Sequence, residues 1–299
     1  MTARTTAPFV TARTLALVRD LELAARIAVD GLMLGRHRSR RAGAGLEFSQ
    51  YRSYQPGDDL RRLDWKLLAR SDRYFVREAE SETSITVRLL LDATGSMAHT
   101  EAGVSKLDYA RFLVAALALL AQRQGDAVGL YALRDEEVTA LRPRRETRHL
   151  HRLLHELERL EPSGGWPPWG RLERALTADA TRGITVLVGD LHERAEEIRT
   201  AVRRLAAVRH DVICFQILGG RERRLEYAGA VTFEELETGR RLDVDASAAR
   251  AAALSRLEAH LTRLRHDLEE RGAAFVPCLL DEPFEEPLRR YLARRARLP

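Results

Sequence analysis

The chain has 299 residues, 45% of them hydrophobic, so it is long enough to bury a full core in one large domain or two small ones. Its 49 basic and 44 acidic residues give a formal net charge of +5, but both signs are mixed along the sequence and aromatic residues do not interleave with the basic runs, so we do not expect a nucleic acid as partner. No window approaches the roughly eighteen unbroken apolar residues of a membrane span, and no compact signal core is present, so we expect a cytoplasmic protein without membrane insertion.

Three segments are predicted from the order of the elements. Residues 1–42 contain one long amphipathic helix, over 11–34, followed by a basic, glycine-rich loop. Residues 43–82 contain a tight Pro-Gly turn, a charged helix and an extended stretch. Residues 83–299 alternate strands with helices, which predicts an α/β domain with a doubly wound, mostly parallel sheet, helices on both faces and a hairpin inserted near residues 230–245.

The most informative stretch is TVRLLLDATGSM, residues 86–97. Its apolar first half is typical of a strand covered on both faces. The strand ends at Asp92, and the hydroxyls of Thr94 and Ser96 follow at alternate positions, where open α/β sheets bind ligands. A carboxylate and two hydroxyls suit a hard cation such as Mg²⁺. The plain alternative is a polar turn in which Thr94 or Ser96 caps a helix.

Downstream of this stretch, apolar runs and helical periodicities alternate. Asp190 follows a strand predicted over 184–188, which places it at the same sheet edge as Asp92. Cys214 and Cys278 lie in apolar runs and are expected to be buried thiols. The predicted elements are helices over 105–122, 147–160, 171–180, 195–208, 247–271 and 285–297, and strands over 127–133, 137–141, 184–188, 211–218, 231–236, 241–244 and 274–280.

The block before the strand carries a family resemblance. The order Tyr-Arg-x-Tyr-x-Pro-Gly-Asp-Asp, Arg-x-x-Asp-Trp, Ala-Arg and then an aliphatic strand ending in Asp-x-Ser-x-Ser-Met resembles a bacterial family, catalogued as domain of unknown function 58. The resemblance implies a von Willebrand factor A-like fold with a metal-ion-dependent adhesion site. The matching residues are Tyr51, Arg52, Tyr54, Pro56, Gly57, Asp58, Asp59, Arg62, Asp64, Trp65, Ala69, Arg70, Asp92, Thr94, Ser96 and Met97.

The adhesion site that this resemblance implies is formed by Asp92, Thr94, Ser96 and Asp190. Two carboxylates and two hydroxyls would hold Mg²⁺ and leave a position for a carboxylate of a partner protein. The family usually has a threonine before the helix of the second loop, whereas this sequence has Gly170, which offers no side-chain ligand. We therefore expect the affinity for Mg²⁺ to be weakened.

Two further groups of residues are predicted to contact partners. Trp166 and Trp169 lie in a Pro-Gly loop beside the expected site, where exposed aromatic residues often anchor partners, and packing inside the loop is the alternative. The family block supplies the second group, which consists of Tyr51, Arg52, Tyr54, Asp58, Asp59, Arg62, Asp64, Trp65 and Arg70.

The family resemblance also implies a function. Relatives accompany MoxR-type AAA+ ATPases, which are regarded as chaperones that mature or assemble other proteins. We therefore expect a noncatalytic protein–protein interaction adaptor that links such an ATPase to a client protein. The alternative is a Mg²⁺-dependent hydrolase or phosphotransferase that uses Asp92 and Asp190, although the sequence has no recognisable nucleophile–base pair and no P-loop. The sequence leaves the client and the oligomeric state open.

Overall fold

The computed structural model describes residues 20–27, 29–30, 51–53, 70, 74–77, 85–177, 181–192, 195–207, 210–234, 236, 239–283 and 285–295. The chain forms two compact units, of which the first comprises residues 1–34 and 85–299 and the second residues 35–84. In the second unit, strands β1 (Tyr51–Ser53) and β2 (Phe75–Arg77) pair antiparallel. The helix predicted over 59–69 lies outside the described residues.

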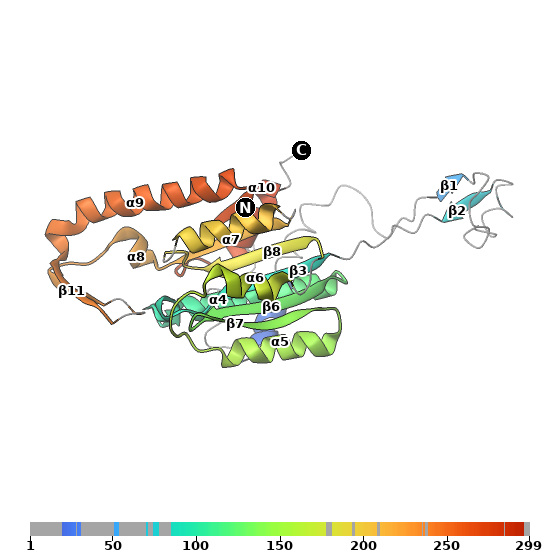
Figure 1. Ribbon diagram of the computed structural model, residues 1–299, viewed down its shortest axis with the longest axis horizontal. Helices are drawn as coiled ribbons and strands as arrows, with labels where there is room; N and C mark the ends of the chain where they lie inside the picture. The colour runs from blue at the N-terminus through green and yellow to red at the C-terminus, as the bar shows by residue number, and fades with distance from the viewer. Residues whose placement is uncertain are drawn as a thin grey trace, which may run out of the picture. The chain divides into compact units, whose positions relative to one another are not determined.

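The first unit is built on a six-stranded sheet (Figure 1). The strand order is β12-β9-β8-β3-β6-β7, and neighbouring strands pair in parallel except for β7, which is antiparallel to β6. This order confirms the predicted doubly wound, mostly parallel sheet. The strands are β3 (Thr86–Asp92), β6 (Ala127–Arg134), β7 (Glu137–Arg144), β8 (Gly183–Gly189), β9 (Asp211–Leu218) and β12 (Ala273–Leu279).

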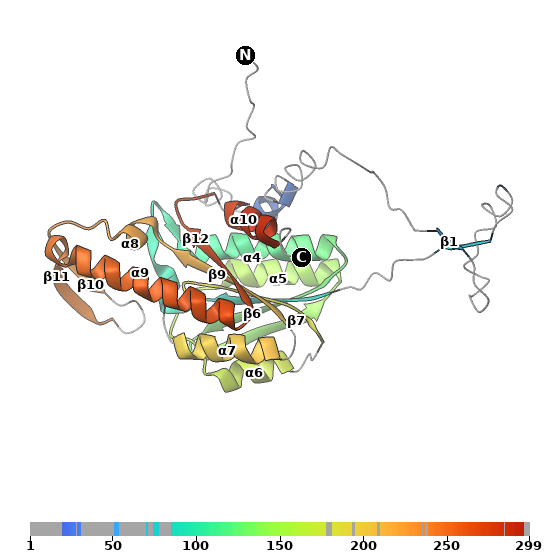
Figure 2. The same ribbon diagram turned by 90° about the horizontal axis from the view of Figure 1, so that it is seen from above.

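Helices cover both faces of this sheet (Figure 2). Side chains alternate across β3, so Leu89 and Leu91 join one buried cluster while Leu90 joins the other. The first cluster also contains side chains of α4 (Lys106–Arg123), α5 (Thr147–Arg159) and α10 (Glu285–Arg295). The second contains side chains of α6 (Trp169–Thr177), α7 (Ala195–Ala207) and α9 (Ala246–Glu270).

Helical residues near the N-terminus belong to the same unit as the sheet. Residues 21–27 and 29–30 are helical, and Ala24 is buried in the first cluster. The guanidinium of Arg123, at the end of α4, lies 2.6 Å from Asp30 Oδ1. The N-terminal helix, predicted as part of a separate segment, therefore packs on the sheet domain.

Several short elements are absent from the sequence prediction. The loop after β3 contains the 3₁₀ helix η2 (Gly95–Ala98) and a small hairpin, β4 (Thr100–Glu101) and β5 (Val104–Ser105). The helix α8 (Gly220–Arg224) follows β9 and leads to the predicted hairpin, β10 (Ala230–Glu234) and β11 (Arg241–Asp245). Helix α6 begins at Trp169 rather than at 171, so the predicted loop over 161–170 is two residues shorter.

Both outer strands of the sheet carry a proline. Pro143 lies in β7, beside a bulge where the pairing with β6 shifts between Val128 and Leu130. A Cβ on Gly129 would lie 2.8 Å from Pro143 Cδ, so the bulge requires glycine at this position. Pro277 lies in β12 at the other edge. Proline is tolerated at these positions because its missing N–H can face outward from the sheet.

No helix in the described part of the chain is both long enough and apolar enough to cross a lipid bilayer.

Candidate functional site

The two central strands of the sheet define the candidate site. From β3 the chain adds β6 and β7 on one side, and from β8 it adds β9 and β12 on the other. The junction between β3 and β8 is therefore the topological switch point, where open α/β sheets bind ligands beyond the carboxyl ends of the strands. Asp92 is the last residue of β3, and Asp190 directly follows β8.

A glycine allows these two strand ends to approach closely. A Cβ on Gly189 would lie 2.5 Å from Asp92 Cβ and 2.7 Å from Asp92 Oδ2. These distances are far shorter than real contacts, so any larger residue would push the Asp92 side chain away from the end of β8. Glycine is required here because of this contact, and Asp92 lies close enough to Asp190 for their charges to interact.

The loop after β3 is organised by hydrogen bonds between its own polar groups. Asp92 Oδ1 accepts hydrogen bonds from the backbone N–H of Thr94, at 3.0 Å, and from Thr94 Oγ1, at 2.8 Å. The hydroxyls of Thr94 and Ser96 lie 3.1 Å apart. The Thr94 side chain makes no capping bond to η2, so the plain helix-cap interpretation does not describe it. Thr94 is buried, whereas Ser96 is partly exposed.

The loop after β8 holds Asp190 from several sides. Asp190 Oδ1 accepts a hydrogen bond from the backbone N–H of His192 at 3.3 Å, and the Ser96 hydroxyl also bonds to the Asp190 carboxylate. Gln216, a buried residue of β9, donates from Nε2 to the Asp190 backbone carbonyl at 3.1 Å. Lys106 Nζ lies 3.2 Å from Asp190 Oδ2. The two predicted loops and the start of α4 thus meet at one point.

Lys106 and its partner Glu222 are the residues of this cluster that sequence reasoning missed. Lys106 is 2% exposed in the first turn of α4, and its ammonium lies 3.2 Å from Asp190 and 3.0 Å from Glu222 of α8. Ser105 caps this helix, and its side chain accepts the N–H of Asp108. A cation in the first turn opposes the helix dipole, so the two carboxylates must hold it there. A lysine at the start of an otherwise apolar helix was the available signal.

The charges in this cluster shift the ionisation of its members in opposite directions. Burial and then the charge of Asp190 raise the pKa of Asp92 to about 7. Burial opposes the ionisation of Asp190, but the charges of Lys106 and His192 outweigh it and lower the pKa of Asp190. Burial would lower the pKa of Lys106, but Asp190 and Glu222 raise it. Asp190 and Lys106 therefore form a buried ion pair at neutral pH, beside an Asp92 that titrates there.

The oxygen donors have the chemistry that Mg²⁺ requires, but the arrangement of charge does not suit the ion. Among the described residues, no group of three or more His, Cys, Asp or Glu side chains gathers to hold a metal. Gly170 is in the first turn of α6 and contributes no donor. The Lys106 ammonium already occupies one oxygen of Asp190. The residues present therefore do not fit a tightly held Mg²⁺, and a weak site remains a prediction.

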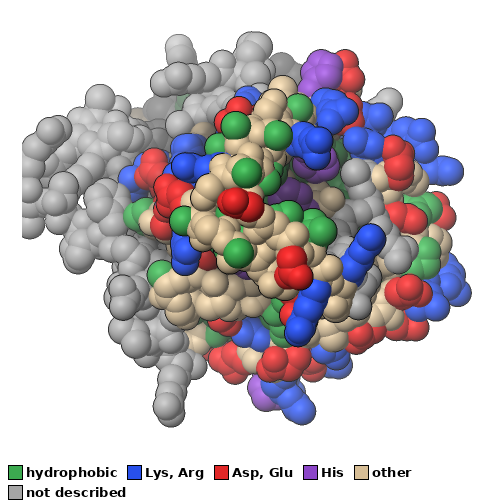
Figure 3. Space-filling view, turned by 90° about the vertical axis from the view of Figure 1, so that its left-hand side faces the viewer, with side chains coloured by type: hydrophobic (Ala, Val, Ile, Leu, Met, Phe, Trp, Pro, Cys, Tyr) green, Lys and Arg blue, Asp and Glu red, His purple; other side chains and the backbone are tan. Residues whose placement is uncertain are grey.

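The carboxyl edge presents a mixed surface around this cluster. Figure 3 shows side chains of both charges interspersed at this end of the molecule, with histidine in a recess. His192 lies 3.8 Å from Glu222 through Nε2, and its ring stacks on that of His260 with centroids 5.6 Å apart. The Glu101 carboxylate of β4 accepts the backbone N–H groups of Arg221 and Glu222, which fastens the small hairpin to α8.

Comparison with known proteins identifies the family. The family model described as "Protein of unknown function DUF58" matches residues 50–263. The chain belongs to this family. Uncharacterized proteins of Mycobacterium tuberculosis and Mycobacterium bovis are 28% identical to this DUF58 chain over 294 residues, which cover 94% of the chain and 90% of each relative. The match confirms the resemblance that the block around Tyr51 and the Asp92 loop predicted.

Solved structures with similar folds include three proteins. The conserved hypothetical protein BatB from Bacteroides thetaiotaomicron matches 72% of this DUF58 chain and 100% of its own at a TM-score of 0.48 and 12% identity. An aerotolerance-related membrane protein from Bacteroides fragilis matches 70% and 98% at a TM-score of 0.46 and 13% identity. The SpRpn10 VWA domain matches 70% and 95% at a TM-score of 0.40 and 9% identity.

The predicted partner-binding residues of this DUF58 chain fall into different environments. Trp166 is only 3% exposed and packs in the second cluster, so it is a core residue rather than an exposed anchor, and the packing alternative describes it. Trp169 is half-buried against the same cluster. Of the family block, Tyr51 and Arg52 lie in β1 and Arg70 is exposed. The rest lie outside the described residues, namely Tyr54, Asp58, Asp59, Arg62, Asp64 and Trp65.

Proposed function

We propose that this DUF58 chain is a noncatalytic protein-binding adaptor, and that the carboxyl edge of its sheet is the binding face. The observation that carries the proposal is the way the charged groups at the switch point engage one another. Asp92 holds the Thr94 loop, and Asp190 is paired with Lys106. A general base or a nucleophile must instead face its substrate. These groups fix the shape of the edge rather than project from it.

Exposed apolar side chains beside this edge support a binding role. The hairpin of β10 and β11 follows α8, beyond the carboxyl end of β9. Phe233 and Leu242 face each other across it and are 38% and 62% exposed, and Leu236 near its tip is 48% exposed. Large apolar groups gathered on a surface mark protein-interaction sites more often than scattered ones do. At the carboxyl edge itself, Ser96 and Glu222 are partly exposed polar residues.

The proposed partners are a MoxR-type AAA+ ATPase and a client protein, in the cytoplasm. The family resemblance supports this part of the proposal, and an adaptor needs two binding surfaces. The carboxyl edge of the sheet domain is one, and the block of residues 43–82 is the other. Mg²⁺ is not required in this mechanism, because Lys106 provides the positive charge beside Asp190.

A Mg²⁺-dependent hydrolase or phosphotransferase is the second candidate. The observation that favours it is the pKa of Asp92, which at about 7 suits a general base. Against it, Asp92 is 3% exposed and its Oδ1 already accepts two hydrogen bonds from Thr94. A base in that position reaches a substrate only if the loop after β3 opens.

The test is a binding measurement between the full chain and the MoxR-type ATPase of the same genome, by biolayer interferometry with and without Mg²⁺. We expect Leu242→Ser combined with Phe233→Ser to weaken binding at least tenfold. The matched control is Ile85→Ser, which also replaces an exposed apolar side chain by a hydroxyl. Ile85 directly precedes β3 and is 41% exposed. Equal binding by all variants would refute the proposal that the β10–β11 hairpin belongs to the binding face. Turnover of a phosphoester or peptide that disappears in Asp92→Asn would establish the enzyme instead.

A further inference from the structure

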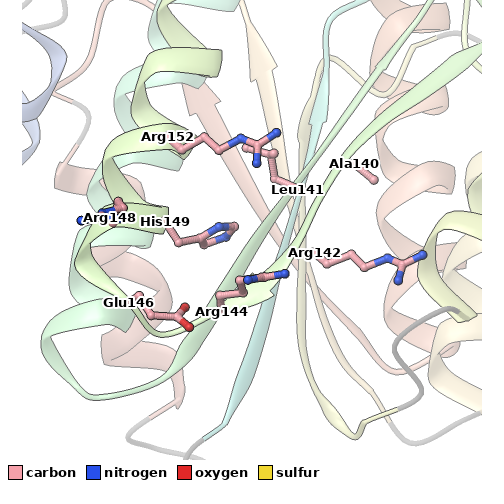
Figure 4. Close-up of a pocket in the computed structure, with 8 residues that line it drawn as sticks. All are labelled: Ala140, Leu141, Arg142, Arg144, Glu146, Arg148, His149 and Arg152. Atoms are coloured by element: carbon pink, nitrogen blue, oxygen red, sulfur yellow. The ribbon is translucent and has the colours of Figure 1, made fainter.

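A basic hollow of about 490 Å³ lies between β7 and α5 (Figure 4). Leu141, from the buried face of β7, forms part of its wall. Its charged and titratable lining consists of Arg142, Arg144, Glu146, Arg148, His149 and Arg152. In Figure 4 the side chains of His149 and Arg152 extend from α5 toward β7, whereas Arg142 extends away from α5.

This hollow lies toward the amino ends of the parallel strands, whereas the Asp92 cluster lies at their carboxyl ends. Arg144 pairs with Val128, the second residue of β6, so it lies at the amino ends of the parallel strands. The bulge brings Arg144 there. Leu141 pairs with Leu130 and Arg144 with Val128, so two residues three positions apart occupy the same face of the strand. Arg144 therefore shares its face with buried Leu141, on the side that α5 covers.

Within the described part of the chain, the arginines of this hollow have no acidic partners. Elsewhere in the described chain, surface arginines commonly pair with carboxylates, as Arg123 does with Asp30 and Arg171 with Glu137. None of the four arginines of the hollow makes an ion pair with a carboxylate among the described residues. Because Arg142 extends away from α5, three arginines against one glutamate leave two positive charges around this surface. Such a concentration of unpaired guanidinium groups attracts an anion.

The start of helix α5 adds to the positive potential, and a histidine in the hollow senses that potential. Helix α5 has 13 residues, and its N-cap residue Glu146 makes no side-chain capping bond. The Glu146 carbonyl accepts the N–H of His149, which leaves the N–H groups of Thr147 and Arg148 for an anion. His149 donates a hydrogen bond from Nε2 to the Val128 carbonyl oxygen at 3.0 Å. Burial, with the charges of Arg144 and Arg152, lowers the pKa of His149 despite that bond. The imidazole is thus neutral at pH 7 and reports the local field.

We propose that this hollow binds a small ligand with clustered phosphate groups, such as pyrophosphate or the polyphosphate end of a nucleotide. Guanidinium groups donate paired hydrogen bonds to phosphate oxygens, and the net positive charge of the lining attracts such a group. The volume is within the range of small-molecule sites. An extended acidic peptide fits less well, because Pro143 and the bulge interrupt the strand along which it would align.

The test is isothermal titration of the full chain with sodium pyrophosphate at constant ionic strength, with ATP in a second series and orthophosphate and sulfate as controls. We expect saturable one-to-one binding of pyrophosphate, at least tenfold tighter than that of sulfate. The double variant Arg144→Gln with Arg152→Gln should lose at least tenfold in affinity. Arg152→Lys alone should lose part of it, because lysine keeps the charge without the planar fork. Glu146→Gln should bind more tightly.

The matched control is Arg256→Gln on the exposed face of α9, which removes the same charge far along the sequence from the hollow. We expect it to bind pyrophosphate as the parent chain does. The His149 imidazole resonance in NMR spectra should move on titration and give a readout within the site. An equal loss in Arg256→Gln, binding of sulfate as tight as that of pyrophosphate, or a His149 resonance that does not move would each overturn the proposal. Tighter binding of a single-stranded oligonucleotide or of a polyglutamate peptide would replace it with a macromolecular partner.

Discussion

Replacing Asp92 by asparagine is expected to stabilise the folded chain at neutral pH. The pKa of Asp92 is raised from 3.8 to about 7 in the native structure, mainly because the carboxyl group is buried. Between these two values the folded chain keeps a proton that the unfolded chain releases, so its stability falls as pH rises through this window. The full pKa difference corresponds to roughly 4 kcal/mol, and because Asp190 shares the interaction we expect about half of that. Asparagine keeps the Oδ1 acceptor for Thr94 and carries no charge.

The assay is thermal unfolding followed by circular dichroism from pH 4 to pH 8 in EDTA. The melting temperature of Asp92→Asn should match that of the parent near pH 4 and exceed it by about 4–8 °C at pH 8 for a domain of this size. Asp190→Asn should have the opposite effect, because its lowered pKa stabilises the fold above pH 3.8 and the exchange breaks the pair with Lys106. Asp243→Asn, on the exposed hairpin, is the control. A destabilised Asp92→Asn at pH 8, or a pH-independent difference, would refute the reasoning.

Other substitutions test other parts of the site. Lys106→Met leaves the Asp190 carboxylate buried without its cation, so we expect a loss of about 3–5 kcal/mol in urea unfolding. The same variant should bind Mg²⁺ more tightly than the parent in calorimetry, and unchanged affinity would show that the lysine does not compete with the ion. Gly189→Ala should lose roughly 1–3 kcal/mol, because the added methyl would lie 2.5 Å from the facing aspartate Cβ. Gly170→Ala, with open space around it in α6, should instead gain about 0.4–1 kcal/mol. Ser105→Ala removes the cap of α4 and should lose about 1 kcal/mol, and a neutral result would contradict the capping role.

The larger elements of the sheet domain follow from local sequence pattern. The strand predicted over 211–218 coincides with β9, and the apolar run before Asp92 forms β3. These elements are long, and their periodicity matches their burial, which is the strongest signal in a sequence. The prediction is weaker where tertiary contacts decide. The two prolines before Trp169 predict a loop. Helix α6 nevertheless begins at Trp169, because this side chain packs on the second cluster.

The candidate site was predictable only in part. Asp92 and Asp190 are predicted because each comes at the carboxyl end of an apolar run, and the sheet topology then brings the ends of β3 and β8 together. Lys106 and Glu222 are not predicted by the sequence. Lys106 lies 84 positions from Asp190 along the chain, and Glu222 lies 116 positions from Lys106. No local pattern connects residues at such separations. Gly189 is not predicted either, because the need for glycine there arises from the Asp92 side chain, which is a neighbour in space and not in sequence.

The prolines at the two margins of the sheet limit how this protein associates. A strand recruited from outside needs a continuous row of N–H and C=O groups, and Pro143 and Pro277 each interrupt that row. The protein is therefore poorly suited to seed ordered stacking of its own copies or of an unfolded polypeptide beside it. In the adaptor function that we propose, a client would be held through side chains, and it would be released without pairing as an added strand.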